Sequence, residues 1–258
     1  MKFYTVYTPE LIDHLRLLER SMYDFGKEFT LHPIVSPLPT GFIRTIQHQN
    51  NIDFKLDQIV KTVASNLGET IVWADVDIVF VGYGVYDTIQ SYIADADTDM
   101  CCVIDEANID ELNGGSRANG GFFVIKCTEK TLLFWRKVRD FPKKRTTPSK
   151  KEHSESNHGF YEQDVINTLL PELNVKFLPE SFWCCHRRNE WGNKGVFART
   201  GRYWPEKIIL FHATSYIDSA GKLYKIQRAL MGDFGPNPIW CILDEEGNPI
   251  APCDPLAT

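Results

Sequence analysis

The stretch Thr70-Ile-Val-Trp-Ala-Asp-Val-Asp-Ile-Val-Phe80 carries the clearest structural signal in this chain of 258 residues. It is an apolar run rich in β-branched residues, which is typical of a buried strand. Two carboxylates, Asp75 and Asp77, interrupt it at a spacing of two, so on an extended backbone they project to the same side. Two buried negative charges are costly unless they are compensated, and hard divalent cations prefer carboxylate ligands. The pair therefore predicts a cation site that would in turn hold a diphosphate.

Strand and helix patterns alternate on both sides of this run. Strands are predicted at residues 3–7, 29–35, 100–104 and 120–125. Helices are predicted at residues 11–22, 53–66, 85–93 and 129–141, the last one capped by Thr128. This alternation predicts an α/β fold with a mixed, mainly parallel central sheet flanked by helices. No convincing boundary divides the chain, so residues 1–258 are expected to form a single domain.

Residues 142–158 are polar, charged and without periodicity. The segment is too long for a plain connector. It is expected to be a flexible loop, and both a functional lid and a disordered stretch fit its composition.

Composition limits the possible partners and the compartment. The formal net charge is -6 and there is no basic stripe, so a nucleic-acid partner is not expected. The first residues show no charged n-region and no apolar h-region, and there is no long apolar run, so neither a secretory signal nor a membrane span is expected. Its seven cysteines include no Cys-x-x-Cys pair, which favours free thiols in a reducing cytoplasm.

Three later segments place polar groups next to apolar runs. Asn119-Gly120 stands at the start of a predicted strand, where glycine allows a close backbone approach to a ligand, although a tight turn would explain it equally. Glu162-Gln163-Asp164 opens a predicted helix, where the helix dipole alone accounts for acidic residues. His212 follows an apolar strand predicted at residues 207–210 and is either a third metal ligand or a structural histidine.

A strand with Asp-x-Asp is also typical of phosphatases of the haloacid dehalogenase type. There the first aspartate, here Asp75, would be the nucleophile, and the second, here Asp77, the general acid. Those enzymes usually carry the motif near the start of the chain and complete a magnesium site with a later acidic pair. Gly232-Asp233 offers only one of the two acids. The phosphatase hypothesis is therefore disfavoured.

Five blocks in order resemble the GT-A-type, metal-dependent glycosyltransferases, specifically the nucleotide-diphospho-sugar transferase family and its retaining members. The resemblance spans about residues 50 to 225, and it rests on the blocks Trp73–Phe80, Asn119–Ile125, Glu162–Asn167, Val175–Pro179 and Phe211-His212. It implies one GT-A-like, Rossmann-like domain.

The resemblance also implies how the cation and the nucleotide are bound. Asp75, Asp77 and His212 would hold Mn²⁺ or Mg²⁺, and Asp75 would also contact the ribose. Lys222 is the nearest candidate for the lysine that contacts the diphosphate, although it stands further from the histidine than is usual in the family. Thr5–Thr8 occupies the place of the family's first strand, whose end holds the nucleotide base.

Around the donor sugar, the resemblance assigns further residues. Lys55, with Lys61 as the competing choice, corresponds to a basic residue aimed at the donor, and Asn119 with Gly120 would line the sugar. Gln163 would lie beneath the anomeric carbon. It is flanked by Glu162 and Asp164, which would hold sugar hydroxyls; the family usually has aspartate where Glu162 stands.

The function implied is transfer of a sugar from a nucleotide-diphosphate sugar to a hydroxyl acceptor, with retention at the anomeric carbon. Uridine is the commonest base in the family. The acceptor class is open among glycans, lipids and proteins. A catalytically silent sugar-nucleotide binder on the same fold is the remaining alternative.

Overall fold

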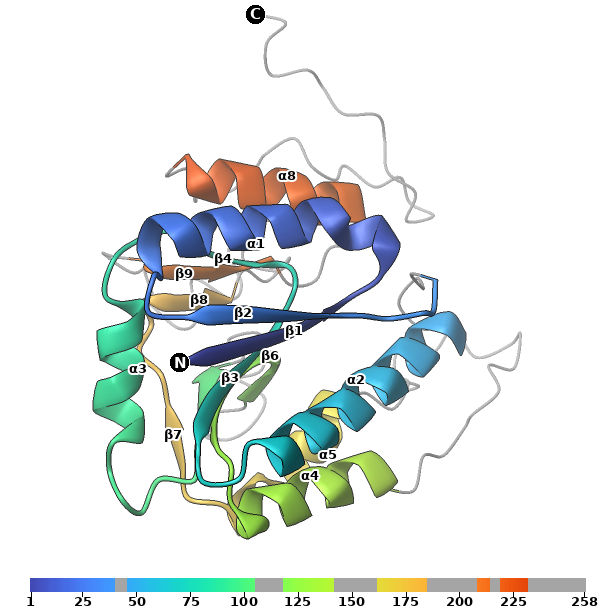
Figure 1. The fold of residues 1–258 in the computed structure, drawn as a ribbon, viewed down its shortest axis with the longest axis vertical. Coiled ribbons are helices and arrows are strands. Elements are labelled where there is room, and N and C mark those ends of the chain that lie inside the picture. Colours follow the sequence, from blue (N-terminus) through green and yellow to red (C-terminus); the bar gives the residue numbers. More distant parts are fainter. Residues whose placement is uncertain (40–45, 105–117, 142–161, 185–207, 214–218, 232–258) are drawn as a thin grey trace, which may run out of the picture.

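The computed structural model describes residues 1–39, 46–104, 118–141, 162–184, 208–213 and 219–231 (Figure 1). Strands and helices alternate in the first half, as the sequence predicts. The elements up to residue 104 are β1 (Lys2–Tyr7), η1 (Pro9–Leu11), α1 (Ile12–Phe25), β2 (Thr30–Val35), α2 (Ile46–Ser65), β3 (Thr70–Asp75), β4 (Ile78–Phe80), α3 (Val85–Ile93) and β5 (Met100–Ile104). Those that follow are β6 (Ala118–Lys126), α4 (Glu129–Asp140), α5 (Glu162–Leu169), η3 (Leu170–Glu172), β7 (Val175–Phe177), β8 (Phe182–Cys184), β9 (Leu210–His212) and α8 (Ser219–Leu230).

A six-stranded sheet with the order β2-β1-β3-β6-β5-β7 forms the centre of the fold. β1 is parallel to β2 and β3, and β5 is parallel to β7, whereas β6 is antiparallel to both of its neighbours. The mixed, mainly parallel sheet predicted from the sequence is thereby confirmed. The register pairs Val6 of β1 with Asp75 of β3, so Thr8, which follows β1, lies at the same edge of the sheet as Asp75.

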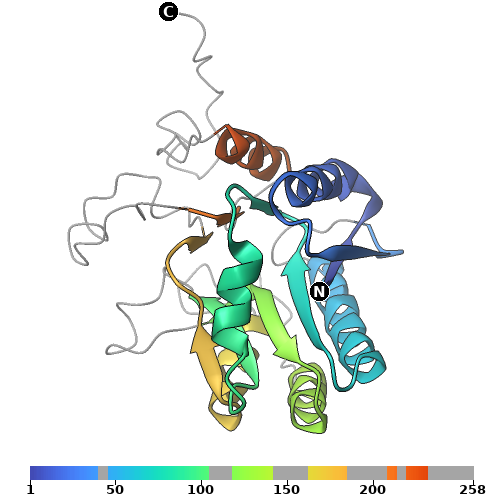
Figure 2. The same ribbon diagram turned by 60° about the vertical axis from the view of Figure 1, so that its left-hand side comes forward.

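Alternate residues of the central strands supply two hydrophobic cores, one on each face. On β3, Val72 and Ala74 pack in the core shared with α1 and α3, whereas Ile71 and Trp73 pack in the core shared with α2, α4 and α5. Figure 1 shows α2, α4 and α5 together on one side, and Figure 2 brings α3 in front of the strands on the other. Burial on both faces explains why β3 reads as a continuous apolar run.

The stretch from Thr70 to Phe80 does not form one extended strand, so that expectation was wrong. Val76 and Asp77 form a turn between β3 and β4. The turn lets β4 leave the central sheet and enter a second, three-stranded sheet with the order β4-β9-β8. The i, i+2 rule for extended chains therefore does not account for how the two aspartates meet.

Helix boundaries agree with the sequence where capping or apolar spacing is strong. Thr128 caps α4 through a reciprocal pair of bonds: its hydroxyl accepts from the Thr131 N–H at 3.2 Å, and its own N–H donates to Thr131 Oγ1 at 3.0 Å. By contrast, α2 begins at Ile46, ahead of the predicted start at residue 53, because its first residues are mostly polar and give no periodic signal. The predicted loop at residues 142–158 lies outside the described residues.

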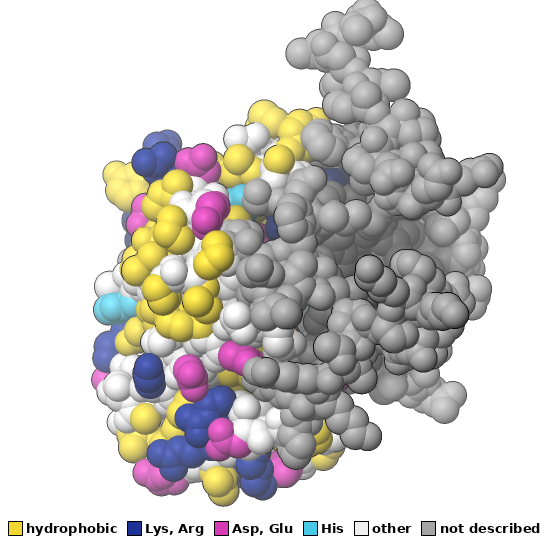
Figure 3. Space-filling view, turned by 90° about the vertical axis from the view of Figure 1, so that its right-hand side faces the viewer, with side chains coloured by type: hydrophobic (Ala, Val, Ile, Leu, Met, Phe, Trp, Pro, Cys, Tyr) yellow, Lys and Arg dark blue, Asp and Glu magenta, His cyan; other side chains and the backbone are white. Residues whose placement is uncertain are grey.

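The described residues also show the character of one surface, the state of three cysteines and whether any helix suits a membrane. On the face in Figure 3, acidic and basic side chains lie next to one another near the lower end of the described part, and hydrophobic side chains gather above them. Cys101, Cys102 and Cys127 are buried free thiols. Among the helices of the described residues, none combines the length and the apolar character needed to cross a bilayer.

Candidate active site

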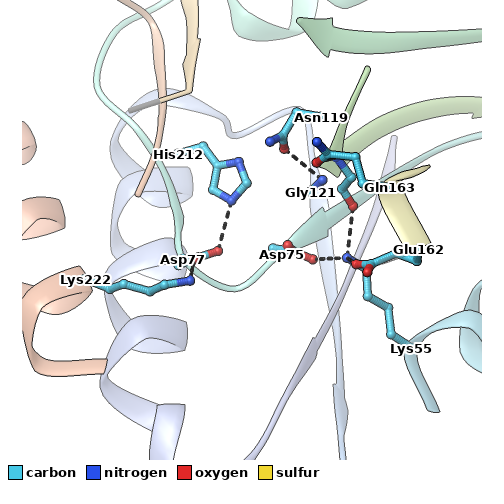
Figure 4. Close-up of polar contacts among 10 residues, drawn as sticks. Lys55, Asp75, Asp77, Asn119, Gly121, Glu162, Gln163, His212 and Lys222 are labelled. Carbon is cyan, nitrogen blue, oxygen red and sulfur yellow. Dashed lines mark hydrogen bonds and ion pairs between the residues drawn. The ribbon is translucent and has the colours of Figure 1, made fainter. Parts of the chain in front are cut away.

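Asp75, Asp77 and His212 converge at the edge of the central sheet where β3 ends (Figure 4). One potential ligand atom from each residue lies within 4.8 Å of the others. Asp77 and His212 are buried, whereas the Asp75 side chain is about one-third exposed, at 34%. The sequence predicted this grouping, although the backbone route to it is a turn rather than an extended strand.

The second sheet explains why a histidine so distant in sequence reaches the two acids. β9 pairs antiparallel with β4, and the register sets His212 opposite Ile78, the residue after Asp77. The Ala213 N–H donates to the Asp77 carbonyl oxygen at 3.0 Å and fixes the end of this pairing. The His212 Nε2 then lies 3.2 Å from Asp77 Oδ1.

Gly121 of β6 provides the space into which His212 fits. A Cβ atom at this position would overlap His212 Cε1 and would lie 2.9 Å from both Asp75 Oδ2 and His212 Nε2. Contacts below 3.0 Å are not found for real Cβ atoms, so any side chain here would displace the histidine or the carboxylate. In the structure, the lack of a side chain at Gly121 thus admits the neighbouring His212 ring.

Lys55 from α2 ties three elements together at this edge. Its ammonium group lies 2.7 Å from Asp75 Oδ1, donates to the Gly120 carbonyl oxygen at 2.9 Å, and lies 3.4 Å from Glu162 Oε1. Burial by itself would lower the pKa of Lys55, but the charges of Asp75 and Glu162 outweigh it and raise that pKa above its ordinary value. Lys61 is exposed, so Lys55 is the lysine of α2 that joins the cluster.

Lys222 from α8 approaches the other aspartate. Its Nζ lies 2.5 Å from Asp77 Oδ2. Burial by itself would raise the pKa of Asp77, but the Lys222 and His212 side chains lower it well below its usual range. For the same reason the pKa of Lys222 is raised despite its burial. Asp75 is thus paired with Lys55, and Asp77 is paired with Lys222.

A hydrogen-bonded set on β6 and α5 adjoins the carboxylates. The Gly120 N–H donates to Gln163 Oε1 at 2.9 Å, and Asn119 Oδ1 accepts from the Gly121 N–H at 2.9 Å. Asn167 fastens α5 to the start of β6: its amide accepts from the Ala118 N–H at 2.8 Å and donates to the Ala118 carbonyl at 2.9 Å. Its Nδ2 also donates to the Gln163 carbonyl at 2.7 Å, so Gln163 is held from two sides.

Other predicted residues lie near this set. Asp164 occupies the next position of α5 after Gln163 and is half-buried. Thr8 is buried just beyond the end of β1.

Sequence reasoning missed one titratable residue beside the cluster. His48 is half-buried on α2, and it interacts electrostatically with Glu162, Lys222 and Lys55, while burial lowers its pKa. It precedes Lys55 by seven residues, about two helical turns, and so shares a face of α2 with it. This spacing is the signal that could have identified it, but the first residues of α2 were not predicted to be helical.

The donor set suits a hard divalent cation. Ligands of one six-coordinate cation lie about 3 to 4.2 Å apart when each is about 2.1 Å away from it, so atoms within 4.8 Å need only a small movement. Three carboxylates (Asp75, Asp77 and Glu162) face two ammonium groups (Lys55 and Lys222), which leaves one negative charge in excess. Both the ligand types and the sign of the excess charge therefore favour a cation.

Solved structures with a similar fold are glycosyltransferases. GlyE of Streptococcus pneumoniae TIGR4 has a TM-score of 0.52 at 11% identity, over 83% of this chain and 54% of the GlyE chain, so this chain spans about half the length of that protein. A glycosyltransferase involved in glycosylation of the major capsid of PBCV-1 has a TM-score of 0.51 at 12% identity, over 88% and 98% of the two chains. Mouse xyloside xylosyltransferase 1 has a TM-score of 0.51 at 8% identity, over 84% and 99%. The fold is that of the GT-A glycosyltransferases.

Sequence comparison assigns the family. A family model of the nucleotide-diphospho-sugar transferases matches residues 58–226. This range contains both aspartates, His212 and Lys222, and it covers more than half of the chain. The chain belongs to the nucleotide-diphospho-sugar transferase family, a family of glycosyltransferases. No curated protein sequence matches the chain.

Proposed function

We propose that this protein transfers a sugar from a nucleotide-diphosphate sugar to a hydroxyl group and that it requires a divalent cation, Mn²⁺ or Mg²⁺. The observation that carries this proposal is the convergence of Asp75, Asp77 and His212, with ligand atoms within 4.8 Å, inside the range matched by the family. When bound, the cation would neutralise charge on the departing nucleoside diphosphate.

The lysines contribute positive charge where the leaving group would lie. Lys222 donates to the diphosphate, and Lys55 holds Asp75 and Glu162 in place at the donor. Preorganised charge of this kind is usually the largest single contribution to catalysis, because it need not reorganise during the reaction. Asp75 also accepts a hydrogen bond from the ribose, and Thr8 contacts the base at the end of β1.

Retention is the expected stereochemical outcome. Gln163 lies beneath the anomeric carbon, between Glu162 and Asp164, which hold sugar hydroxyls, while Asn119 and Gly120 line the sugar. The Gln163 carboxamide is neutral, and its oxygen already accepts the Gly120 N–H, so it is a poor nucleophile. The acceptor hydroxyl therefore attacks from the face that the diphosphate leaves.

The finer features of the proposal come from the family likeness and, for the compartment and the single domain, from the sequence. The donor is a uridine-diphosphate sugar, the acceptor is a glycan, lipid or protein hydroxyl, and the enzyme works in the cytoplasm as one domain. The buried free thiols of the described strands are consistent with a reducing compartment. The family match counts against the phosphatase hypothesis. It does not distinguish an enzyme from a silent sugar-nucleotide binder, and only a measurement of turnover does so.

The test is Mn²⁺-dependent hydrolysis of, or transfer from, a panel of uridine-diphosphate sugars. Asp77→Asn removes a cation ligand and is expected to lower turnover at least about 100-fold. The matched control is Asp97→Asn, the same change at an exposed site away from the cluster, which keeps full turnover.

Three results would separate the alternatives. Unchanged turnover in Asp77→Asn means that the cation assignment is wrong. Hydrolysis of a generic aryl phosphate that is lost in Asp75→Asn supports the phosphatase. Metal-dependent nucleotide binding without turnover, across a broad acceptor panel, supports the silent binder.

A further inference from the structure

Both carboxylate oxygens of Asp77 are already engaged within the protein. Oδ1 lies 3.2 Å from His212 Nε2, and Oδ2 lies 2.5 Å from Lys222 Nζ (Figure 4). The Asp77 side chain is only 7% exposed, so solvent contributes little to its compensation. A cation that binds to Asp77 must therefore share or replace the Lys222 contact.

An ammonium group and a divalent cation repel each other strongly at this range. Two unit charges 4 Å apart in a protein environment of intermediate dielectric interact about four times as strongly as they do in water, and a divalent ion doubles the effect. Lys222 thus opposes a cation at Asp77 for as long as it stays in contact with the carboxylate. When no cation is bound, the Lys222 ammonium group compensates the negative charge of Asp77.

The two lysines of the cluster differ in how firmly they are held. Lys55 has three described partners, on β3, β6 and α5, and its side chain is 11% exposed. Lys222 is 29% exposed, and within the described residues Asp77 is the carboxylate paired with it. Lys222 can therefore leave its carboxylate at a smaller cost, provided that another anion receives it.

We propose that Lys222 is a specificity-determining residue that makes cation binding depend on the diphosphate. Before the donor arrives, Lys222 occupies Asp77 and keeps its affinity for a divalent cation low. The diphosphate then draws Lys222 away from Asp77, and the cation and the diphosphate bind together. This inference rests on the proposed function, because it needs Asp77 to be a cation ligand.

The coupling between the two ligands must be reciprocal. If the diphosphate raises the affinity for the cation by some factor, the cation raises the affinity for the diphosphate by the same factor. Such factors typically fall between about 5 and 150. Part of the coupling comes from direct contact between the cation and the diphosphate. The part carried by Lys222 disappears when the lysine is removed. Removal of Lys222 should therefore strengthen the binding of the cation alone and weaken the binding of the cation–diphosphate complex.

The experiment compares Lys222→Met with wild type by calorimetric titration of Mn²⁺ alone and of a preformed Mn²⁺–pyrophosphate complex. We expect Lys222→Met to bind Mn²⁺ alone at least about fivefold more tightly and to bind the complex more weakly. Lys222→Arg, which keeps the charge, should behave like wild type. Lys137→Met removes a lysine from an exposed ion pair with Glu172 and controls for the loss of one positive charge.

Mn²⁺ affinity that is unchanged or weaker in Lys222→Met would overturn the inference and leave Lys222 as a diphosphate contact at most. If wild type binds neither Mn²⁺ nor the Mn²⁺–pyrophosphate complex, or if Asp77→Asn binds the complex like wild type, the proposed function fails as well. The two failures are thus distinguishable. Circular dichroism establishes that Lys222→Met is folded; if it is not, Lys222→Gln, which can still donate to Asp77, replaces it in both titrations.

Discussion

At the scale of single residues, the site depends on a glycine, Gly121, which has no side chain. Gly121 leaves room for the His212 ring beside Asp75, and a Cβ there would lie 2.9 Å from His212 Nε2. We expect Gly121→Ala to displace His212 and to weaken Mn²⁺ binding by about 10- to 100-fold, the range found when groups that orient metal ligands are altered. Titration calorimetry measures this directly.

Gly120→Ala is the matched control for that substitution. A Cβ at residue 120 would come no closer than 3.4 Å to a Gln163 atom, which is near ordinary van der Waals contact. We expect its Mn²⁺ affinity to match that of wild type. Equal affinities of Gly121→Ala and wild type would show that His212 does not take part in cation binding.

Lys55 is expected to contribute to stability as well as to donor binding. Lys55→Met leaves Asp75 and the nearly buried Glu162 without their cation. We expect the free energy of unfolding in urea to fall by about 1 to 3 kcal/mol, toward the low end because Asp75 is partly solvated. Lys61→Met makes the same change at an exposed position of α2 and should leave stability almost unaltered. Equal losses in the two variants would contradict the assigned role of Lys55.

At the scale of elements, α5 carries the residues that we propose to lie beneath the donor. Asn167 holds α5 against β6 through Ala118 and also bonds the Gln163 carbonyl. We expect Asn167→Ala to reduce donor turnover while Mn²⁺ affinity stays unchanged, because the proposed cation ligands lie on β9 and around the end of β3. Transfer assays and calorimetry on one preparation measure both quantities.

Thr128→Ala is the control for a purely structural loss. It removes the cap of α4 and should cost about 1 kcal/mol of stability without a comparable change in turnover. If both variants lose turnover in proportion to their stability, Asn167 has no specific positioning role.

The sequence predicted elements well where a local pattern extends over several residues. The first part of the predicted strand (residues 70–75), helix 85–93 and the Thr128 cap followed from apolar runs, spacing and capping chemistry. The turn at Val76 and Asp77 was missed because the apolar run continues through it. The cause of the break is the pairing of β4 with β9, which joins segments more than 100 residues apart and leaves no local trace.

At the scale of the whole molecule, alternation of strands and helices was sufficient to predict a mainly parallel α/β fold. The second sheet was not predicted, since β4, β8 and β9 are three residues each and too short to show a period. The cation ligands were expected together from family resemblance, whereas their neutralisation by Lys55 and Lys222 is visible only in three dimensions. A single domain over residues 1–258 stays a prediction.

The two cores make a prediction about the thiols of the central sheet. Cys101 and Cys102 face opposite cores from β5, and burial raises the pKa of Cys101 and of Cys127 to about 12. A thiol with a pKa of about 12 is thiolate to about one part in ten thousand at pH 8. We expect these three cysteines to react with a thiol reagent only as fast as the protein unfolds, as followed by mass spectrometry of labelled peptides. Rapid labelling of the native protein would contradict this packing.

The central claim is that Asp75, Asp77 and His212 hold a cation through which a nucleotide sugar is bound. Thermal unfolding with a panel of nucleotide sugars, each with and without Mn²⁺, tests it most directly. A true donor at a hundred times its Kd should add about 2.7 kcal/mol of stability, only when Mn²⁺ is present and not in Asp77→Asn. Equal stabilisation by the same nucleotide sugar without Mn²⁺, or in Asp77→Asn, would contradict the claim.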